Sequence, residues 1–329
     1  MSLELLQRPR RLRQNPLIRS LAQETDLRAK KFLLPIFVCE GNGIEKVHPS
    51  LSGCVTRSLD RLIPFLKNLE AQGVGGILLF GVSQKKDEGG SEAIRKDNIV
   101  VRSIREIRES CPQLLVGTDI ALDPYTDHGH DGIYRNGVVL NDESVQRLCE
   151  MSCLHAEAGA HLLAPSDMMD GRIQEIRESL DEEAYQNTLL MSYTAKYASC
   201  FYGPFRDSLG AKVEGNKRSY QMNPANRKEA LRELELDLSE GADIVMVKPA
   251  SHYLDIISDF KERSLIPVAA YQVSGECAMI ELGAKQGLFD RDHAIYESCL
   301  SISRAGADLI ASYFASEIPR ILAKMDLIQ

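Results

Sequence analysis

The chain has 329 residues, 44% hydrophobic and 26% charged, a balance typical of a soluble globular protein with one large α/β domain or two average ones. The net charge of −8, the absence of Trp and the 6% aromatic content argue against a nucleic-acid binder. No apolar stretch approaches membrane-spanning length, so we expect neither nucleic acid nor a membrane as partner.

The first segment, residues 1 to about 30, precedes any predicted strand and carries a basic cluster of Arg8, Arg10, Arg11 and Arg13. It lacks the long apolar core of a signal peptide, and its acidic residues fit poorly with a transit peptide. Together with eight scattered cysteines that form no CxxC pair, this favours a cytoplasmic protein. We interpret the segment as an N-terminal arm for subunit contacts; the alternative is a disordered basic tail.

From residue 31 to residue 329, short apolar runs alternate with amphipathic helical stretches. Eight of these runs have the length and composition of buried parallel strands, the number that closes a (β/α)8 TIM barrel. A doubly wound open sheet is the alternative, but no GxGxxG follows the first strand. The predicted strands are Phe32–Val38, Gly76–Gly81, Leu114–Ala121, His161–Ser166, Thr188–Lys196, Asp243–Lys248, Pro267–Val273 and Asp308–Phe314.

The segment at the end of the third predicted strand is dense in carboxylates and imidazoles. Asp and His are both metal ligands and their short spacing allows convergence, so a metal site is one interpretation. The other is a hydrogen-bonded loop whose carboxylates orient water or substrate. Because the segment has no thiolate, a hard cation or no ion is favoured over tetrahedral zinc. It contains Asp119, Ala121, Asp123, Asp127, His128, His130 and Asp131.

Two lysines end successive predicted strands, Lys196 the fifth and Lys248 the sixth. A lysine ammonium among apolar neighbours loses hydration, so its pKa falls and the amine becomes a nucleophile toward carbonyls. The alternative is that each lysine extends out of the barrel end or pairs with a carboxylate. Two such lysines in neighbouring strand units favour a catalytic pair whose amines approach within one substrate length.

A long loop, Tyr197–Asn223, directly follows the fifth strand, contains glycine and is basic. Loops of this length inside compact domains are usually functional lids or disordered. Because the loop after a barrel strand lies over the active-site mouth, we interpret residues 197–223 as an active-site lid.

Polar side chains from several segments converge on this predicted barrel mouth. Ser274 and Tyr313 lie near the ends of the seventh and eighth strands, where hydroxyls suit a substrate carboxylate. Arg206, Lys217 and Gln221 belong to the predicted lid and suit a second carboxylate. Taken singly, a lid arginine is usually solvated and a strand tyrosine is usually core. Their joint location at one face is what indicates a functional site.

Six short motifs carry a specific resemblance to a known family: Arg8-Pro-Arg-Arg-Leu-Arg, Ser166-Asp-Met-Met-Asp-Gly-Arg, Ser192-Tyr-Thr-Ala-Lys196-Tyr-Ala-Ser, Phe201-Tyr-Gly-Pro-Phe-Arg206-Asp, Ser219-Tyr-Gln-Met-Asn-Pro and Met246-Val-Lys248-Pro. Together they resemble porphobilinogen synthase, also called 5-aminolevulinate dehydratase, essentially end to end. The resemblance implies a TIM barrel with an N-terminal arm, usually a homo-octamer. It also implies a lyase that condenses two 5-aminolevulinate molecules into porphobilinogen for tetrapyrrole (heme) synthesis.

The resemblance further implies a role for each candidate residue. Lys248 would form the Schiff base with the substrate that supplies the propionate side, and Lys196 would bind the other substrate as a second imine. The two substrate carboxylates would be held by two sets of side chains, Ser274 with Tyr313, and Arg206 with Lys217 and Gln221.

Zinc-dependent members of the family have three cysteines in the loop that here spans residues 119–132, and this chain has Ala121, Asp123 and Asp131 there. We therefore expect no catalytic Zn²⁺. The chain resembles the cysteine-free, magnesium-stimulated branch, whose allosteric Mg²⁺ near a subunit interface uses a glutamate that corresponds to Glu233. One carboxylate with several waters is an ordinary magnesium site. In place of zinc, proton transfer or water orientation would fall to Asp119, Asp123, Asp127 or Asp131.

Two other functions are compatible with parts of this pattern. A class I aldolase would use a single essential Schiff-base lysine and an aldehyde acceptor, so with Lys196 replaced it would retain imine chemistry at Lys248 with its second substrate unaffected. A catalytically silent barrel for assembly or metal binding would show no turnover with any keto-amine. The complete set of lysines, with Arg206, Ser274 and Tyr313, argues against such a degenerate copy.

Overall fold

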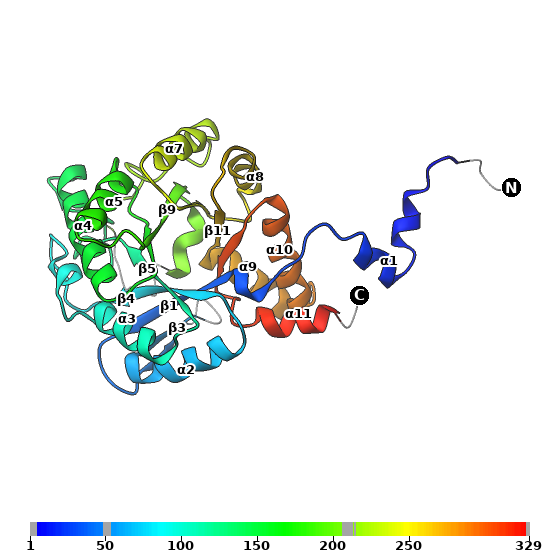
Figure 1. Cartoon of the computed structure of the whole chain (residues 1–329), viewed down its shortest axis with the longest axis horizontal. Coiled ribbons are helices and arrows are strands. Elements are labelled where there is room, and N and C mark those ends of the chain that lie inside the picture. The colour runs from blue at the N-terminus through cyan, green and yellow to red at the C-terminus, as the bar shows by residue number, and fades with distance from the viewer. Residues whose placement is uncertain (1–4, 49–53, 206–212, 214, 327–329) are drawn as a thin grey trace.

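Eight parallel strands close into a barrel in this computed structural model, which describes residues 5–48, 54–205, 213 and 215–326 (Figure 1). The last strand pairs with the first, Phe32 opposite Ile310, and this pairing closes the sheet. The predicted barrel is therefore confirmed, with strand ends shifted by a residue or two. In barrel order the strands are β1 (Phe32–Cys39), β4 (Gly76–Val82), β5 (Leu115–Ile120), β8 (Leu162–Pro165), β9 (Leu189–Lys196), β10 (Ile244–Lys248), β11 (Val268–Gln272) and β12 (Leu309–Ser312).

Helices surround the barrel because each buries one apolar stripe against the strands. In α3 the buried side chains include Ile104 and Ile107, and the Asn98 side chain accepts the Val101 N–H to begin the helix. At the end of α10, Gly306 adopts φ 124°, a conformation that L side chains rarely adopt. The helices are α2 (Leu59–Ala71), α3 (Ile99–Ser110), α4 (Asn141–Glu157), α5 (Arg172–Glu182), α7 (Lys228–Ser239), α8 (Leu254–Arg263), α9 (Ser274–Lys285), α10 (Arg291–Ala305) and α11 (Ile318–Asp326).

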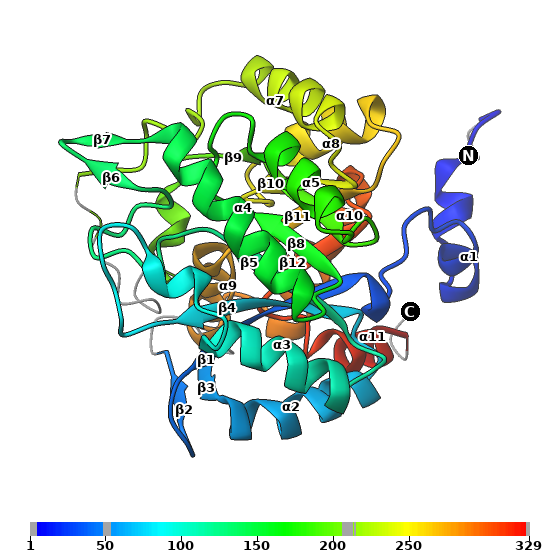
Figure 2. The ribbon, with the colours of Figure 1, turned by 60° about the vertical axis from the view of Figure 1, so that its left-hand side comes forward.

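Two short antiparallel hairpins add to the eight strands of the barrel. In the first, β2 (Glu45–Val47) pairs with β3 (Val55–Ser58), which itself continues the sheet beside β1. In the second, β6 (Tyr134–Arg135) pairs with β7 (Val138–Val139) in the long connection between β5 and α4. Figure 2 shows this second hairpin projecting beside α4 at the edge of the barrel.

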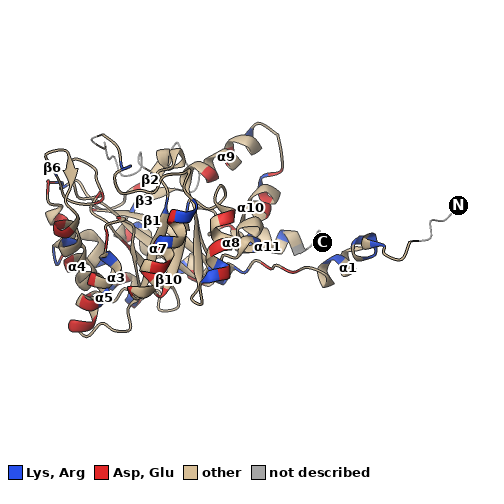
Figure 3. Cartoon of the chain, turned by 90° about the horizontal axis from the view of Figure 1, so that it is seen from above, with Lys and Arg blue, Asp and Glu red and all other residues tan. Residues whose placement is uncertain are grey.

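The N-terminal segment lies outside the barrel and extends away from it (Figure 1). It contains a 3-10 turn, η1 (Pro9–Arg13), and a short helix, α1 (Pro16–Leu21), and neither has a buried side chain. Figure 3 shows Lys and Arg gathered around α1, whereas both signs of charge mix on the barrel helices. None of the helices in the described part of the chain has both the length and the apolar character that crossing a membrane requires.

The predicted lid, residues 197–223, follows β9, and its two described ends are held to the barrel. Its first part forms a 3-10 turn, η4 (Cys200–Tyr202). Where its second part returns, Met222 donates its N–H to the Lys196 carbonyl at 3.0 Å and accepts the Ala198 N–H at 2.8 Å. Arg206, one of the predicted site residues, lies outside the described residues.

Candidate active site

Lys196 and Lys248 are neighbours at the carboxyl end of the barrel, because they occupy the same register position on the adjacent strands β9 and β10. Each is only 6% exposed. The Lys248 carbonyl accepts the Tyr197 N–H at 2.9 Å and the Tyr202 hydroxyl at 3.2 Å, which ties the end of β10 to the start of the lid. The structure thus brings together the two lysines that the sequence singled out.

Four aromatic rings surround the Lys248 ammonium, and we call them the aromatic cage. From the Lys248 Nζ to the ring centroids, the distances are 4.4 Å for Tyr271, 5.0 Å for Tyr193, 5.2 Å for Tyr202 and 5.3 Å for Phe205. Among the described residues, no carboxylate forms an ion pair with this amine. Burial, and next the charge of Lys196, lower the pKa of Lys248 to about 7. A large fraction of the amine is therefore neutral near pH 7.

Lys196 has different surroundings. Its Nζ donates to the Asp131 Oδ2 at 3.1 Å and to the carbonyl of Ser166 at the end of β8. Asp131 also accepts from the Lys217 Nζ at 2.5 Å, and the same ammonium lies 3.2 Å from the Asp123 carboxylate. Burial alone would raise the pKa of Asp131, but two ammonium groups hold it below its usual range.

The four aspartates on β5 and in the loop after it, Asp119, Asp123, Asp127 and Asp131, differ in exposure and surroundings. Asp119 and Asp123 are buried, whereas Asp127 is exposed and therefore does not join the cluster. Burial, and next the charge of Asp123, raise the pKa of Asp119 to about 7. The Asp119 Oδ1 has no hydrogen-bond partner among the described residues, so it remains able to accept a proton or a substrate donor.

The imidazoles of this loop bind protein groups. The His128 Nε2 lies 3.2 Å from the Glu88 carbonyl, and the His130 Nδ1 lies 3.0 Å from the Tyr220 hydroxyl. That hydroxyl also accepts the Asp131 N–H at 3.3 Å, which connects the returning end of the lid to the carboxylate shared by two lysines. The described residues contain no group of three or more His, Cys, Asp or Glu that could hold a metal ion.

The predicted carboxylate-binding residues fall into two places. Ser274 lies near Lys248, because its Oγ accepts the N–H of Phe205, a residue of the aromatic cage, at 3.0 Å. The same hydroxyl donates to the Phe201 carbonyl at 3.4 Å. The Tyr313 hydroxyl lies 3.5 Å from that of Tyr271, another residue of the cage. Each hydroxyl therefore contacts a residue of the aromatic cage that surrounds the Lys248 amine.

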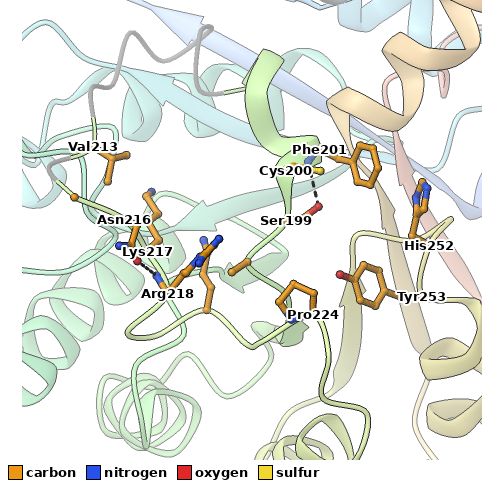
Figure 4. A pocket seen from close by; sticks show the side chains of 13 residues that line it. Ser199, Cys200, Phe201, Val213, Asn216, Lys217, Arg218, Pro224, His252 and Tyr253 are labelled. Carbon is orange, nitrogen blue, oxygen red and sulfur yellow. Dashed lines mark hydrogen bonds between the residues drawn. The ribbon is translucent and has the colours of Figure 1, made fainter.

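Lys217 and Gln221 line a cavity of about 650 Å³ between described residues of the predicted lid and the segment of His252 and Tyr253 (Figure 4). Figure 4 shows Lys217 and Arg218 on one side of this cavity and Phe201, His252 and Tyr253 on the other. Gln221 is 5% exposed, and its Oε1 has no partner among the described residues. The two cationic side chains suit an anionic group, and the unpartnered amide oxygen suits a hydrogen-bond donor of the same ligand.

Glu233 lies apart from the lysines, on the half-buried side of α7. It lines a separate cavity of about 480 Å³ together with Asp170, Glu229, the β6–β7 hairpin and the lid residues Tyr220 and Met222. Burial raises the pKa of its carboxyl group, and the nearby charge of Arg172 opposes that effect. The cavity is therefore an acidic site that touches the returning end of the lid.

Sequence reasoning missed the aromatic cage and the Ser166 carbonyl. Two cage members had a usable signal, because Tyr193 and Tyr271 lie on the strands β9 and β11 that flank Lys248. Tyr202 and Phe205 come from the lid, and their direction depends on how the lid folds back. A backbone carbonyl such as that of Ser166 has no signature in the sequence.

Known proteins resemble the chain along nearly its whole length. The sequence profile of the family "Delta-aminolevulinic acid dehydratase" matches residues 6–321. Over 324 residues the chain is 50% identical to the delta-aminolevulinic acid dehydratase of Chlamydia pneumoniae, covering 98% of each protein. Over 315 residues it is 43% identical to that of Escherichia coli (strain K12), covering 96% of this chain and 97% of the relative.

A solved structure extends this similarity to the fold. The crystal structure of the delta-aminolevulinic acid dehydratase (porphobilinogen synthase) from Toxoplasma gondii ME49, in complex with the reaction product porphobilinogen, matches with a TM-score of 0.94. The identity is 39%, and the match covers 97% of this chain and 92% of that chain. Fold and site together define a TIM-barrel enzyme with a buried pair of lysine amines. The chain belongs to the delta-aminolevulinic acid dehydratase, or porphobilinogen synthase, family, and its activity is that of this lyase.

Proposed function

We propose that the chain condenses two 5-aminolevulinate molecules into porphobilinogen through Schiff bases on Lys248 and Lys196, with loss of two waters. The observation that carries this proposal is the pair of buried amines in register on β9 and β10. In each imine, the Nζ lone pair attacks the substrate ketone carbon, and the ketone oxygen leaves as water. Two amines in one site suit a reaction that joins two keto-amine substrates.

Lys248 is proposed to react first, because its lowered pKa leaves a neutral amine available near pH 7. The iminium that it forms is a cation, and the aromatic cage stabilises a cation through the negative faces of its rings. The cage also excludes water from the imine, which slows its hydrolysis.

Asp119 is the aspartate that we propose for proton transfer. Its pKa of about 7 allows it to take and return a proton near neutral pH. Asp131 is instead committed to Lys196 and Lys217, and Asp123 accepts from Lys217. The exposed Asp127 has no support for such a role.

The two substrate carboxylates are proposed to bind on opposite sides of the lysine pair. Ser274 and Tyr313 would hold the carboxylate of the substrate on Lys248, since both contact members of the aromatic cage. Lys217 and Gln221 would hold the second carboxylate in the cavity that they line. We assign Arg206 to this second set only because its sequence motif resembles that of the family.

We further propose a magnesium-stimulated enzyme without catalytic zinc. The Lys217 ammonium lies between Asp123 and Asp131, two of the three places where zinc-dependent relatives have cysteines, and so a cation of the protein already balances these carboxylates. The Glu233 carboxylate lines a cavity with room for water, and one carboxylate with several waters is an ordinary Mg²⁺ site. A bound Mg²⁺ there would favour whichever assembly contains the completed site.

The assembly that we propose is a cytoplasmic homo-octamer. We divide the chain into an arm at residues 1–30 and a catalytic barrel at residues 31–329, with the lid at about 197–223. The arm exposes large apolar side chains, with Leu6 at 99%, Leu17 at 84% and Leu21 at 87%, which supports a role in subunit contacts. Eight free thiols suit a reducing compartment.

One assay tests the function and the metal proposal together: porphobilinogen formation after complete chelation, then with Mg²⁺ or Zn²⁺ restored separately. We expect activity without zinc, and stimulation by Mg²⁺ that Glu233→Ala abolishes while the metal-free turnover persists. Glu235→Ala, which removes an exposed carboxylate of the same helix, is the matched control. No porphobilinogen under any condition overturns the function, and wild-type stimulation of the Glu233 variant overturns the metal site.

A further inference from the structure

The carboxylate of Glu276 is buried in the first turn of α9, with the residue only 2% exposed. It is separate from the aspartate cluster of the barrel mouth. A carboxylate buried away from a counter-ion is costly unless hydrogen bonds compensate for the lost hydration. The contacts of Glu276 therefore indicate why the chain holds a charge in this position.

Glu276 accepts backbone N–H groups from two loops that adjoin the proposed site residues Lys248 and Ser274. Its Oε1 accepts the Ser251 N–H at 2.7 Å, and its Oε2 accepts the Ala250 N–H at 3.4 Å. These donors follow Lys248 by two and three residues. The Oε2 also accepts the N–H of Val273, the residue before Ser274, at 2.8 Å. One carboxylate thus joins the loop after β10 to the loop after β11.

A helix-capping role explains only part of this arrangement. The bond from the Val273 N–H is a local contact at the beginning of α9, three residues from Glu276. Ala250 and Ser251 are 26 and 25 residues away in the chain, and their N–H groups belong to another loop. Charge-assisted bonds to backbone N–H groups are stronger than neutral ones. They therefore restrain the backbone next to Lys248 as well as the helix.

The same carboxylate reaches the base of the lid through His252. The His252 Nδ1 lies 3.4 Å from the Glu276 Oε1, and its ring stacks on Phe201 with centroids 4.3 Å apart (Figure 4). The Phe201 carbonyl in turn accepts from the Ser274 hydroxyl. A Cβ at Gly275 would lie 2.5 Å from that carbonyl oxygen, so only glycine permits this close approach.

We propose that Glu276 is a positioning residue that sets Lys248 and Ser274 relative to each other and, through His252, aligns the base of the lid with them. It acts through backbone N–H groups and does not contact substrate. The inference rests on the proposed roles of Lys248 and Ser274. It predicts that losing the carboxylate affects chemistry at Lys248 more than chemistry at Lys196, whose restraints come from Asp131 and Ser166.

The test measures borohydride trapping of 5-aminolevulinate, with the label at Lys248 and at Lys196 quantified separately by peptide mass spectrometry. In Glu276→Gln, we expect the initial rate of labelling at Lys248 to fall about tenfold, as for one or two lost charge-assisted hydrogen bonds, while labelling at Lys196 changes less than about twofold. The KM for 5-aminolevulinate should rise. Glu281→Gln is the matched control, because Glu281 lies on the same helix and pairs with Arg291 at 2.5 Å.

An unchanged ratio of Lys248 to Lys196 label in folded Glu276→Gln would overturn the inference. If that variant does not fold, His252→Ala takes its place, because the His252 side chain is 47% exposed and its truncation should cost little stability. It should shift the label ratio and KM in the same direction by about threefold, the size of one weak contact, and a wild-type ratio and KM overturn the inference. No label at Lys248 in the wild-type chain would instead overturn the proposed function itself.

Discussion

Lys248 and Lys196 end neighbouring strands in the same register, yet their surroundings differ. Lys248 lies among four aromatic rings, and Lys196 lies against the Asp131 carboxylate and the Ser166 carbonyl. The rings come from β9, β11 and the lid, whereas the carboxylate comes from the loop after β5. Equivalent positions on adjacent strands therefore acquire different chemistry from the side chains that other segments add.

The difference suits a site that must treat two identical substrates unequally. A neutral amine attacks a carbonyl, whereas an ammonium held by a carboxylate does not until it loses its proton. The charge of Lys196 also lowers the pKa of Lys248, so the two surroundings are coupled. Changes that remove one of the two lysines, or the groups that distinguish their surroundings, should then cost the most activity.

Lys248→Met should have the largest effect, because it removes the amine and keeps most of the unbranched side chain. We expect kcat/KM for porphobilinogen formation to fall by at least about 10⁴-fold, since a covalent step is lost. Lys196→Met should also be inactive, yet it should keep borohydride-dependent label at Lys248. Lys228→Met, at an exposed lysine, is the control. Residual wild-type turnover in Lys248→Met would contradict the division of roles.

Asp131→Asn should have the next largest effect. It leaves the Lys196 and Lys217 ammonium groups buried without their shared carboxylate, and such a change is strongly destabilising. We expect about a 100-fold loss of kcat/KM and a loss of about 3 kcal/mol in the free energy of unfolding, measured by kinetics and urea denaturation. Asp127→Asn, an exposed aspartate of the same loop, should change neither.

The pH dependence of kcat/KM should show an acid limb with a midpoint near 7. The pKa of Lys248 is lowered to about 7, so its reactive neutral form increases as the pH rises through that value. The pKa of Asp119 is raised to about 7, so its basic form increases in the same direction. We expect kcat/KM to fall at least about tenfold per pH unit below the midpoint. A kcat/KM that stays constant between about pH 5 and pH 7 would contradict both assignments.

Tyr193→Phe should have the smallest effect. The ring lies 5.0 Å from the Lys248 Nζ, and its buried hydroxyl has no hydrogen-bond partner among the described residues. Phenylalanine keeps the ring and removes the orphaned hydroxyl, so kcat should change less than about threefold and the free energy of unfolding should stay level or rise by about 1 kcal/mol. A loss of activity of about 100-fold would instead assign the hydroxyl a chemical role.

Most of the barrel could be predicted from the sequence, because strands buried on both faces are continuous apolar runs. The two small hairpins were missed, since they are too short for a periodic pattern. The β6–β7 hairpin did have a signal, Asn136-Gly137, whose positive φ values of 52° and 84° are those of a tight hairpin turn. The Asn136-Gly137 pair would therefore have been sufficient to predict this hairpin.

The site was predictable where position along a strand decides it, as for Lys196, Lys248 and Ser274. The site was less predictable where the fold of residues 197–223 determines which side chains meet. That Lys217 pairs with Asp123 and Asp131 depends on the lid folding back over the loop after β5, across 94 and 86 residues of chain. Glu276 was missed because a carboxylate in the first turn of a helix resembles an ordinary helix cap in sequence, and its backbone partners at Ala250 and Ser251 are distant in the chain.

The most direct test of the central claim is the pH dependence of imine trapping at Lys248 itself. The rate of labelling by 5-aminolevulinate and cyanoborohydride would be measured from about pH 5 to pH 10, a range that includes both a lowered and an ordinary lysine pKa. Mass spectrometry would assign the label to individual lysines. The account predicts that Lys248 is labelled before Lys196, with a midpoint near 7. A midpoint near the ordinary lysine value of about 10.4, or first label at Lys196, would contradict it.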